Sequence, residues 1–383
     1  MTARLTRDRP TWLVYLQLGV FATYLYGLSA ALPMLRAELG LSQTVAGLHG
    51  TMMAVGGVLT GLALPRLTRR LGTRVTVWTG LTGMNVGVLL VVLGHTPQVT
   101  LLAYCLAGGM GSISLYTSMS VLGRHHGPAG PSAISEANAV GGTIGLFAPF
   151  VVSLAAQSAL GWRTALLLTP LLTVLLALAM GRVWVPTPAR EEQAAPSGSA
   201  GSPGLGMRFH LAGAVLFCCV GLEFSFNLWA AKLVSDNTGL SAAVAASALT
   251  AFTAGLALGR FGGARLALRI PPSPLLIGAL GLTFVGWLLF WTSTAPPAAY
   301  AGLLVSGVGV SLHFPLALSR VLTATAGHPE RATGVASLYS SSATGVGPFL
   351  LGALADVSGT QQAFLMVPVM IVLAVGGILV SSR

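Results

Sequence analysis

Long apolar stretches, each ended by charged residues, prolines or glycine clusters, recur along the whole chain. Each is about 20 residues or longer, the length that an α-helix needs to cross the hydrocarbon core of a bilayer. We therefore expect an all-α membrane protein with twelve transmembrane helices. The predicted spans are 11–35, 44–64, 75–94, 98–122, 133–158, 163–184, 209–233, 242–264, 273–292, 298–322, 333–355 and 361–380.

Composition excludes several classes of protein. Of the 383 residues, 54% are hydrophobic and only 8% are charged, whereas about a quarter of the residues of a soluble protein are charged. Twelve spans leave no room for a large soluble domain. The three cysteines all fall in apolar segments, so neither a disulfide framework nor a metal site is expected. No Gly-Lys-Ser/Thr phosphate loop is present, which argues against ATP-driven transport by this chain, and we expect no cofactor.

The basic residues predict the orientation in the membrane, because lysine and arginine concentrate in cytoplasmic loops. With a cytoplasmic N-terminus, all but three of the 20 basic residues fall on the cytoplasmic side, Arg260 and Arg320 among them. The exceptions are Arg36, Arg163 and Lys232. We expect both termini in the cytoplasm, in a bacterial inner membrane. Topology thus explains the net charge of +11, and no nucleic-acid partner is expected.

The chain divides into two similar halves. Residues 185–208 are rich in Pro, Gly, Ser and charge and predict a flexible cytoplasmic linker between 1–184 and 209–383. An offset of 199 residues aligns PRLTRRL at 65–71 with ARLALRI at 264–270, and APF at 148–150 with GPF at 347–349. The same offset aligns the predicted spans. We expect an internal repeat that forms two six-helix, pseudo-symmetric bundles.

Several motifs resemble those of one family. The segment GLALPRLTRRLGTRV at 61–75, predicted as a short cytoplasmic turn, resembles the loop signature of the major facilitator superfamily. Arg70, Gly72 and Arg74 match that signature, whereas Arg69 stands where the family has Asp and Pro65 replaces the leading Gly. The resemblance continues in GGTIGLFAPF at 141–150, LRAELGLS at 35–42, GWR at 161–163 and SATGVGPFLLG at 342–352.

The resemblance implies a fold and a mechanism. Two six-helix bundles would enclose a central cavity lined by the first, fourth, seventh and tenth helices, and rocking of one bundle against the other would give alternating access. The family also implies a competent monomer, with Arg70 and Arg74 at the inner gate. Glu136 could pair with residues 66–74 or with Arg124 and latch that gate, or could be a carboxylate at a helix N-terminus. The Gly-rich fifth span resembles proton-driven exporters, although ordinary helix packing explains its glycines equally well.

Ionisable groups in the middle of predicted spans are candidates for function, because such groups are costly in lipid. Glu223 lies near the middle of the seventh span and Asn227 lies one turn further on. The repeat partner of Glu223 is Tyr24, and that of His313 in the tenth span is Ser114. Glu223 and His313 could carry protons. Alternatively, Glu223 could bond a neighbouring helix or pair with Lys232, and His313 could be a neutral interhelical bridge.

Aromatic side chains could complete a substrate site for an organic solute, or could serve only as packing and interface anchors. The candidates are Tyr24, Tyr26, Tyr116, Trp229 and Tyr339.

These residues favour a secondary active transporter that couples a small organic solute to protons, or to sodium. Efflux of amphipathic or cationic compounds is the leading expectation, and uptake of a neutral solute such as a sugar is the alternative. An anion transporter that binds its solute through an arginine in the middle of the membrane is disfavoured, because the arginines gather at the cytoplasmic ends of the spans. Arg320 is the closest exception. A passive channel or receptor is a third class. A remote alternative is an intramembrane serine protease that pairs Ser112 or Ser114 with His313.

Overall fold

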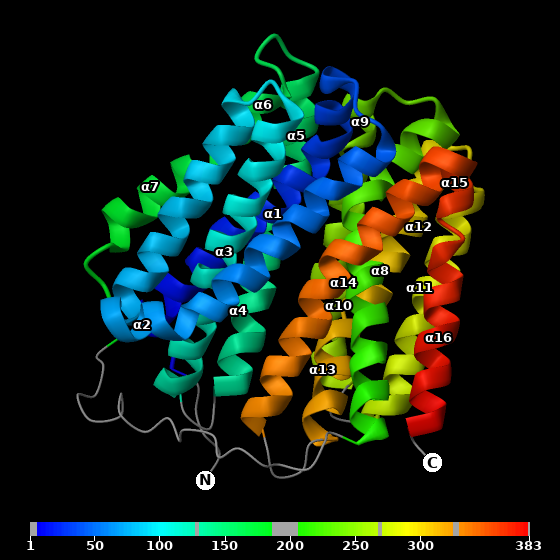
Figure 1. The fold of residues 1–383 in the computed structure, drawn as a ribbon. Coiled ribbons are helices and arrows are strands. Elements are labelled where there is room, and N and C mark those ends of the chain that lie inside the picture. Colours follow the sequence, from blue (N-terminus) through cyan, green and yellow to red (C-terminus); the bar gives the residue numbers. More distant parts are fainter. Residues whose placement is uncertain (1–5, 127–129, 186–205, 267–269, 325–328, 382–383) are drawn as a thin grey trace.

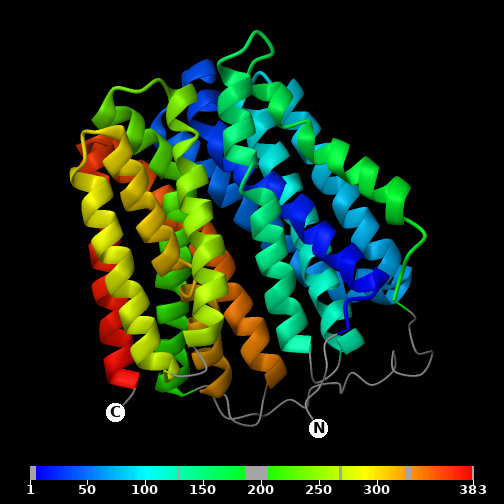
Figure 2. The same ribbon diagram turned by 180° about the vertical axis from the view of Figure 1, so that it is seen from behind.

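The computed structural model describes residues 6–126, 130–185, 206–266, 270–324 and 329–381, which are almost entirely helical (Figures 1 and 2). The first half contains α1 (Arg9–Leu39), α2 (Gln43–Leu93), α3 (Pro97–His126), α4 (Gly130–Gly145), α5 (Ala148–Ala156), α6 (Trp162–Ala165) and α7 (Leu168–Met180). The second half contains α8 (Met207–Thr238), α9 (Ala242–Ala245), α10 (Ala248–Leu266), α11 (Pro272–Thr292), α12 (Pro296–Val310), α13 (His313–Thr323), α14 (Pro329–Ser358), α15 (Thr360–Ala363) and α16 (Met366–Ser381). Most of the predicted linker lies outside the described residues.

The helices confirm the expected membrane architecture. Among the described residues, 11 helical segments are long and apolar enough to cross a bilayer. In the chain, α2 supplies two crossings, and α4 with α5, α6 with α7, α9 with α10, α12 with α13, and α15 with α16 supply one crossing each. α14 adds the twelfth, between the crossings of α13 and α15.

The short turn predicted within residues 61–75 is present but is confined to one residue, and the rest of the segment is helical. Helix α2 continues through Arg66, Arg69 and Arg70, and the backbone leaves helical geometry only at Gly72, with φ 74° and ψ 161°. Side-chain-bearing residues seldom adopt this positive φ, so the reversal needs glycine there. The whole segment was predicted as a turn because arginines are common beyond membrane helices, yet exposed arginines also extend a helix into water.

Contacts at glycines support the internal repeat independently of the sequence motifs. A Cβ atom at Gly56 of α2 would collide with the carbonyl oxygen of Cys105, and a Cβ at Gly255 of α10 would collide with that of Leu304. The two glycines are 199 positions apart, and so are the two residues that they contact. Two further contact pairs repeat at this offset: Gly108 against Met53 with Gly307 against Phe252, and Gly87 against Ala107 with Gly286 against Ser306.

The fifth crossing packs against α1 through its glycines, and its helix is then interrupted. A Cβ at Gly145 would contact Ala22 and Tyr26 at distances too short for carbon atoms. Helix α4 ends at Gly145 and α5 begins at Ala148, with Pro149 in its first turn. In the second half Gly347 of α14 packs closely against α8, but Pro348, the repeat partner of Pro149, lies inside an unbroken helix.

Two motifs far apart in sequence meet at the end of the first half that lies opposite the start of α1. The Arg163 guanidinium pairs with the Glu38 carboxylate at 2.9 Å and donates to the carbonyl oxygens of Val92 and Gly94. The Trp162 indole donates to the same carboxylate at 3.0 Å. One polar cluster therefore joins α1 and α6 to the end of α2, and it is formed by the segments LRAELGLS and GWR.

The two halves touch where α2 and α14 lie side by side, in the upper part of Figure 1. The Asp356 carboxylate of α14 accepts hydrogen bonds from the backbone N–H groups of Gln43 and Thr44, at 2.7 and 2.6 Å. It thereby caps the N-terminus of α2 from the opposite half. Thr360 donates to the Gln43 side chain at 3.0 Å, and a Cβ at Gly47 would press on the Pro348 backbone. This end of the molecule is closed.

The Gly72→Ala substitution is expected to lower stability by about 1 kcal/mol, because a Cβ is strained at positive φ. Steric collision contributes nothing, since no atom lies within 4 Å of the added carbon. Gly61→Ala is the matched control, because Gly61 lies in the same helix in equally open space but has helical backbone. Thermal unfolding in detergent should show a lower melting temperature for the first variant only; equal melting temperatures would contradict the assignment.

The Asp356→Ala substitution is expected to loosen the closed end. Loss of a helix cap costs about 1 kcal/mol, which shifts a two-state population by about fivefold. Spin labels at Leu160 and Val357, exposed residues near the closed end in opposite halves, would report a longer distance component. Asp236→Ala is the control, because Asp236 pairs with Lys232 inside the second half. An unchanged distance distribution would show that the cap does not hold the halves together.

Candidate functional site

A small pocket lies between the two halves, about 100 Å³ in volume. Helices α1, α3 and α4 form one wall, and α8 and α10 form the other. Its polar members are Tyr26, Asn138, Glu223 and Arg260, and the rest are apolar. The apolar members are Leu18, Phe21, Ala22, Leu25, Leu115, Gly141 and Gly142.

Glu223 and Arg260 bring opposite charges to this pocket from neighbouring helices of the second half. The charge of Arg260 acts on both Glu223 and the Tyr26 hydroxyl, so the three groups form one electrostatic unit across the two halves. A Cβ at Gly142 would lie 3.2 Å from Nη1 of Arg260, which places the guanidinium against α4. The absent side chain at Gly142 makes room for it.

The position of Arg260 corrects an interpretation of the sequence. The charge count assigned Arg260 to the cytoplasmic side, and a deep arginine was disfavoured on that basis. In the structure Arg260 belongs to the span Ala242–Gly263, and its side chain lines the pocket between the halves. The signal was present, because Arg260 lies inside the predicted span 242–264. Near the end of a span, a charge count cannot distinguish an inward side chain from a loop side chain.

The structure places Tyr26 and Glu223 in the pocket but sets their expected companions apart. Tyr24 is buried against Phe21, with ring centroids 5.6 Å apart, and does not line the pocket. The Asn227 amide donates to the Glu223 carbonyl oxygen at 3.0 Å, and its own side-chain oxygen is buried without a hydrogen-bond partner. Asn227 does not line the pocket.

His313 and Ser114 each pack inside their own half. The His313 ring contacts the Thr283 hydroxyl of α11 at 3.1 Å, and its Nδ1 is buried without a partner. This is an interhelical bridge, one of the two alternatives for His313. Ser114 is buried where α3 meets Gly80 of α2, and Ser112 donates to the Gly108 carbonyl oxygen at 2.8 Å. Within the described residues, neither serine is hydrogen-bonded to His313.

The remaining aromatic candidates also lie away from the pocket lining. Tyr116 is 45% exposed. Tyr339 bonds the ring of His210 at 3.1 Å and packs over Gly213 of α8. The Trp229 indole donates to the Pro348 carbonyl oxygen at 2.9 Å and so joins α8 to α14. These contacts are structural.

The expected gate residues make contacts within the first half. Glu136 pairs with Arg7 at 2.6 Å, not with residues 66–74 or Arg124, and it lies in the second turn of α4, past the helix N-terminus. Arg70 is exposed. Arg74 donates to the Gly181 carbonyl oxygen at 2.6 Å, which ties the start of the third crossing to the end of α7.

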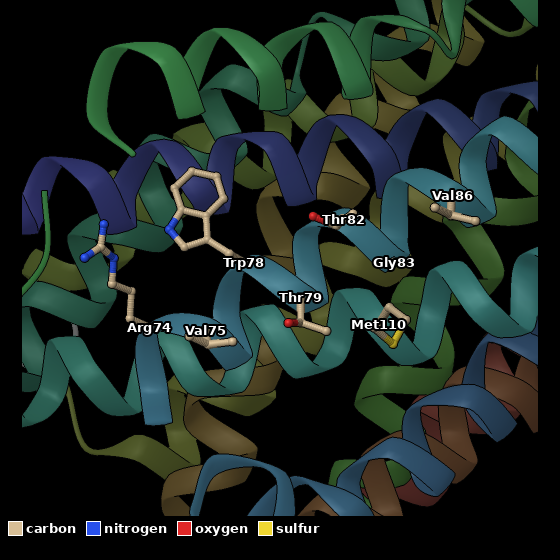
Figure 3. A pocket seen from close by; sticks show the side chains of 8 residues that line it. All are labelled: Arg74, Val75, Trp78, Thr79, Thr82, Gly83, Val86 and Met110. Carbon is tan, nitrogen blue, oxygen red and sulfur yellow. The ribbon is translucent and has the colours of Figure 1, made fainter. Parts of the chain in front are cut away.

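A larger cavity of about 630 Å³ lies on the flank of the first half (Figure 3). Arg74 and Trp78 stand at one end of it and Val86 at the other, and Met110 of α3 forms part of its wall. Apart from Arg74 its lining holds no charged group. Because it is lined by α2 and α3 alone, it is not a passage between the halves.

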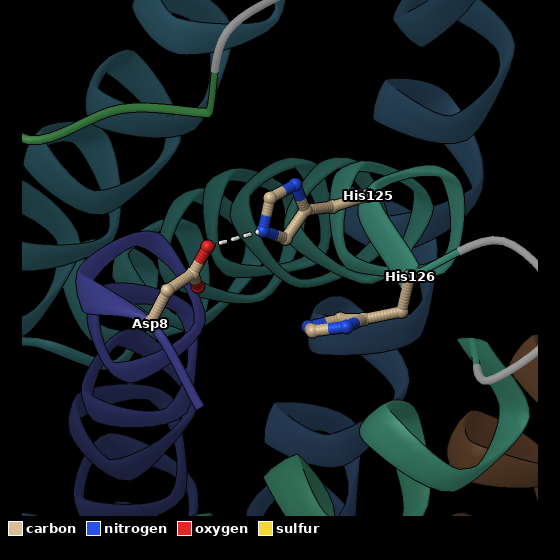
Figure 4. A group of neighbouring side chains, drawn as sticks. All are labelled: Asp8, His125 and His126. Atoms are coloured by element: carbon tan, nitrogen blue, oxygen red, sulfur yellow. Dashed lines mark hydrogen bonds and ion pairs between the residues drawn. The ribbon is translucent and has the colours of Figure 1, made fainter. Parts of the chain in front are cut away.

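Asp8, His125 and His126 cluster where α1 begins and α3 ends (Figure 4). The His125 ring lies 2.7 Å from the Asp8 carboxylate, and the Thr11 hydroxyl bridges Asp8 and His126, at 2.5 and 2.8 Å. Partial burial opposes ionisation of Asp8, but hydrogen bonds from Thr11 and His125 outweigh it and hold the pKa of this carboxyl below its usual value. The internal bonds explain the cluster as a tie between α1 and α3.

Comparison with known proteins agrees with the architecture. The profile of the Major Facilitator Superfamily matches residues 14–211 and again 211–382. No curated protein matches the chain in sequence.

Solved structures share the fold at low identity. A bacterial homologue of the human lysosomal transporter Spinster, inward-facing and occupied, has 14% identity and a TM-score of 0.76 over 99% of this chain and 98% of its own. The nucleoside transporter NupG has 14% identity and a TM-score of 0.74 over 98% of each chain. The E. coli fucose:proton symporter FucP has 16% identity and a TM-score of 0.66 over 98% of each chain. The chain is therefore an integral membrane protein that belongs to the Major Facilitator Superfamily.

Proposed function

We propose that the protein is a secondary active transporter that couples movement of a small organic solute to protons, with Glu223 as the proton-carrying group. The observation that supports this most is that Glu223 lines the pocket between the halves. A carboxyl group at such an interface meets each side of the membrane in turn as the halves rock. It can therefore load a proton on one side and release it on the other.

The closed end fits this proposal when the molecule is oriented by its charges. We place the protein in a bacterial inner membrane with both termini in the cytoplasm. In this orientation the contact between α2 and α14 seals the outer side. The pocket then lies on the inner side of that seal. In the opposite state the seal would open, and the Glu136 and Arg74 ends of the first half would approach the second half.

The solute classes expected from the sequence differ in how they fit the pocket. Efflux of lipophilic cations needs a carboxylate without a competing cation, but Arg260 shares the pocket with Glu223. A neutral solute could be held by hydrogen bonds to Tyr26 and Asn138. Sodium is a weaker candidate for the coupling ion, because Na⁺ needs several oxygen ligands and would lie close to the Arg260 charge.

The Glu223→Gln substitution is expected to abolish solute accumulation driven by a pH gradient and to leave solute exchange at equal pH intact. Glutamine mimics the protonated carboxyl in shape but can neither take up nor release a proton. A solute is first chosen by a melting-temperature screen of sugars, nucleosides, carboxylates and lipophilic cations, because ligands raise the stability of the folded state. Its flux is then measured in proteoliposomes with an imposed pH or sodium gradient.

Asp236→Asn is the matched control, because Asp236 is the other carboxylate of α8 and forms an ion pair with Lys232 outside the pocket. This control is expected to accumulate solute as the wild-type protein does. Accumulation by Glu223→Gln at the wild-type level under a pH gradient would overturn the assignment of the proton to Glu223. Accumulation of solute under a sodium gradient alone would overturn proton coupling itself.

A further inference from the structure

We propose that this pocket binds a small organic monoanion, a short-chain monocarboxylate, through the guanidinium of Arg260, and that the anion travels together with the proton on Glu223. The inference rests on the proposed function and goes beyond it by naming the chemical class of the solute. It follows from where the charges lie, how they are partnered, and the size and lining of the pocket.

Arg260 is close to Glu223 without being neutralised by direct contact. The ion pairs of the described residues are Arg7–Glu136, His125–Asp8, Arg163–Glu38 and Lys232–Asp236, and they do not include Arg260 with Glu223. The guanidinium acts on Glu223 from a longer distance, with pocket space in the same region. A guanidinium presents a planar fork of donors that matches a carboxylate, so the space beside it suits a carboxylate ligand.

The charge balance of the pocket couples the anion to the proton. The charged and titratable groups near Glu223 in the described structure are Arg260 on α10, Tyr26 on α1 and Cys219 on its own helix. With Glu223 ionised, the carboxylate compensates Arg260. With Glu223 protonated, Arg260 is left as an uncompensated cation in a partly buried site, which is unfavourable. A bound monoanion restores neutrality, so proton and anion each favour binding of the other.

The pocket limits the size and valence of the ligand. A volume of about 100 Å³ equals roughly three water molecules at their share of liquid volume. This accommodates a carboxylate with a short tail, and Phe21, Leu25 and Leu115 give that tail an apolar wall. A dianion would leave one charge uncompensated, because Arg260 is the one cationic residue of the lining. Arg320 bonds Ser273 and Ser381 inside the second half and does not line the pocket.

The test measures binding of propionate to the purified full-length protein in detergent, by calorimetry and by melting temperature. Propionamide and propylammonium are the matched ligands, because they keep the size of propionate and change its charge to zero and to plus one. Nitrate shows whether a planar anion without an apolar tail binds as well as propionate does. We expect propionate to bind and to raise the melting temperature, nitrate to bind at least about tenfold more weakly for lack of apolar burial, and the other two not to bind.

Binding should strengthen as pH falls. Between about pH 8 and pH 6, where a simple carboxylate stays ionised, linked uptake of one proton would raise propionate affinity by up to about tenfold per pH unit. Glu223→Gln fixes the neutral form, so its affinity should be high and independent of pH. Asp236→Asn, the control for this variant, should keep the wild-type pH dependence.

Variants of Arg260 test whether its guanidinium binds the carboxylate of the ligand. Arg260→Gln is expected to lower propionate affinity by tenfold or more, whereas Arg260→Lys keeps the charge, loses the planar fork and should retain weaker binding. Arg69→Gln makes the same change at an exposed arginine of α2 and should bind normally. The ligand series on the wild-type protein does not depend on whether an Arg260 variant folds.

The outcomes separate this inference from the proposed function. Binding of propionamide or propylammonium in preference to propionate overturns the anion inference, and Glu223→Gln can still show that transport is proton-coupled. Equal binding of nitrate and propionate overturns the assignment of a carboxylate with a tail. Wild-type propionate affinity in Arg260→Gln overturns the assignment of Arg260 as the group that binds the carboxylate. If propionate binds through Arg260 but Glu223→Gln keeps the full pH dependence, the anion site stands and the role of Glu223 in the proposed function falls.

Discussion

Close backbone contact at glycine residues holds each half together, and the rest of the structure depends on it. In a bilayer the hydrophobic effect does not drive helices toward one another, so packing must do so. Gly56 and Gly255 let the second and eighth crossings approach the backbone of the fourth and tenth. The same contacts occur at matching positions in both halves, so each half is closely packed in the same way. The surface between the halves is packed differently.

The surface between the two halves contains two kinds of contact. At the closed end, backbone N–H groups of α2 are capped by Asp356, an interaction that is specific yet weak enough to be broken. Further along, Tyr26, Glu223 and Arg260 place charges and a hydroxyl group across the same surface. One carboxylate, Asp356, thus links the halves at one end, while another, Glu223, lines the pocket between them.

Much of the fold followed from sequence because bilayer thickness fixes helix length and the repeat offset fixes the pairing of crossings. A turn within residues 61–75 was predicted, but its restriction to Gly72 was not, because arginines mark the membrane boundary and not the end of a helix. In the site, Glu223 and Tyr26 line the pocket, whereas Ser114 and His313 share the expected depth but face other helices. Hydropathy gives the depth of a residue along its helix. It does not give the rotation of a helix that is apolar on all sides, and Arg260 was missed for the same reason.

Among the described residues, the cap that Asp356 places on α2 has no counterpart at α9, although the starts of α2 and α9 are otherwise alike. Ser42 and Ser241, 199 positions apart, cap the two starts in the same way. The residue that matches Asp356 is Gln157, whose amide turns back to Ser153 within its own helix. At this position the side chains of the two halves therefore depart from the pseudo-twofold symmetry, and neither Asp356 nor Gln157 lines the pocket. A substitution there would change the contact between the halves and leave every residue that lines the pocket in place.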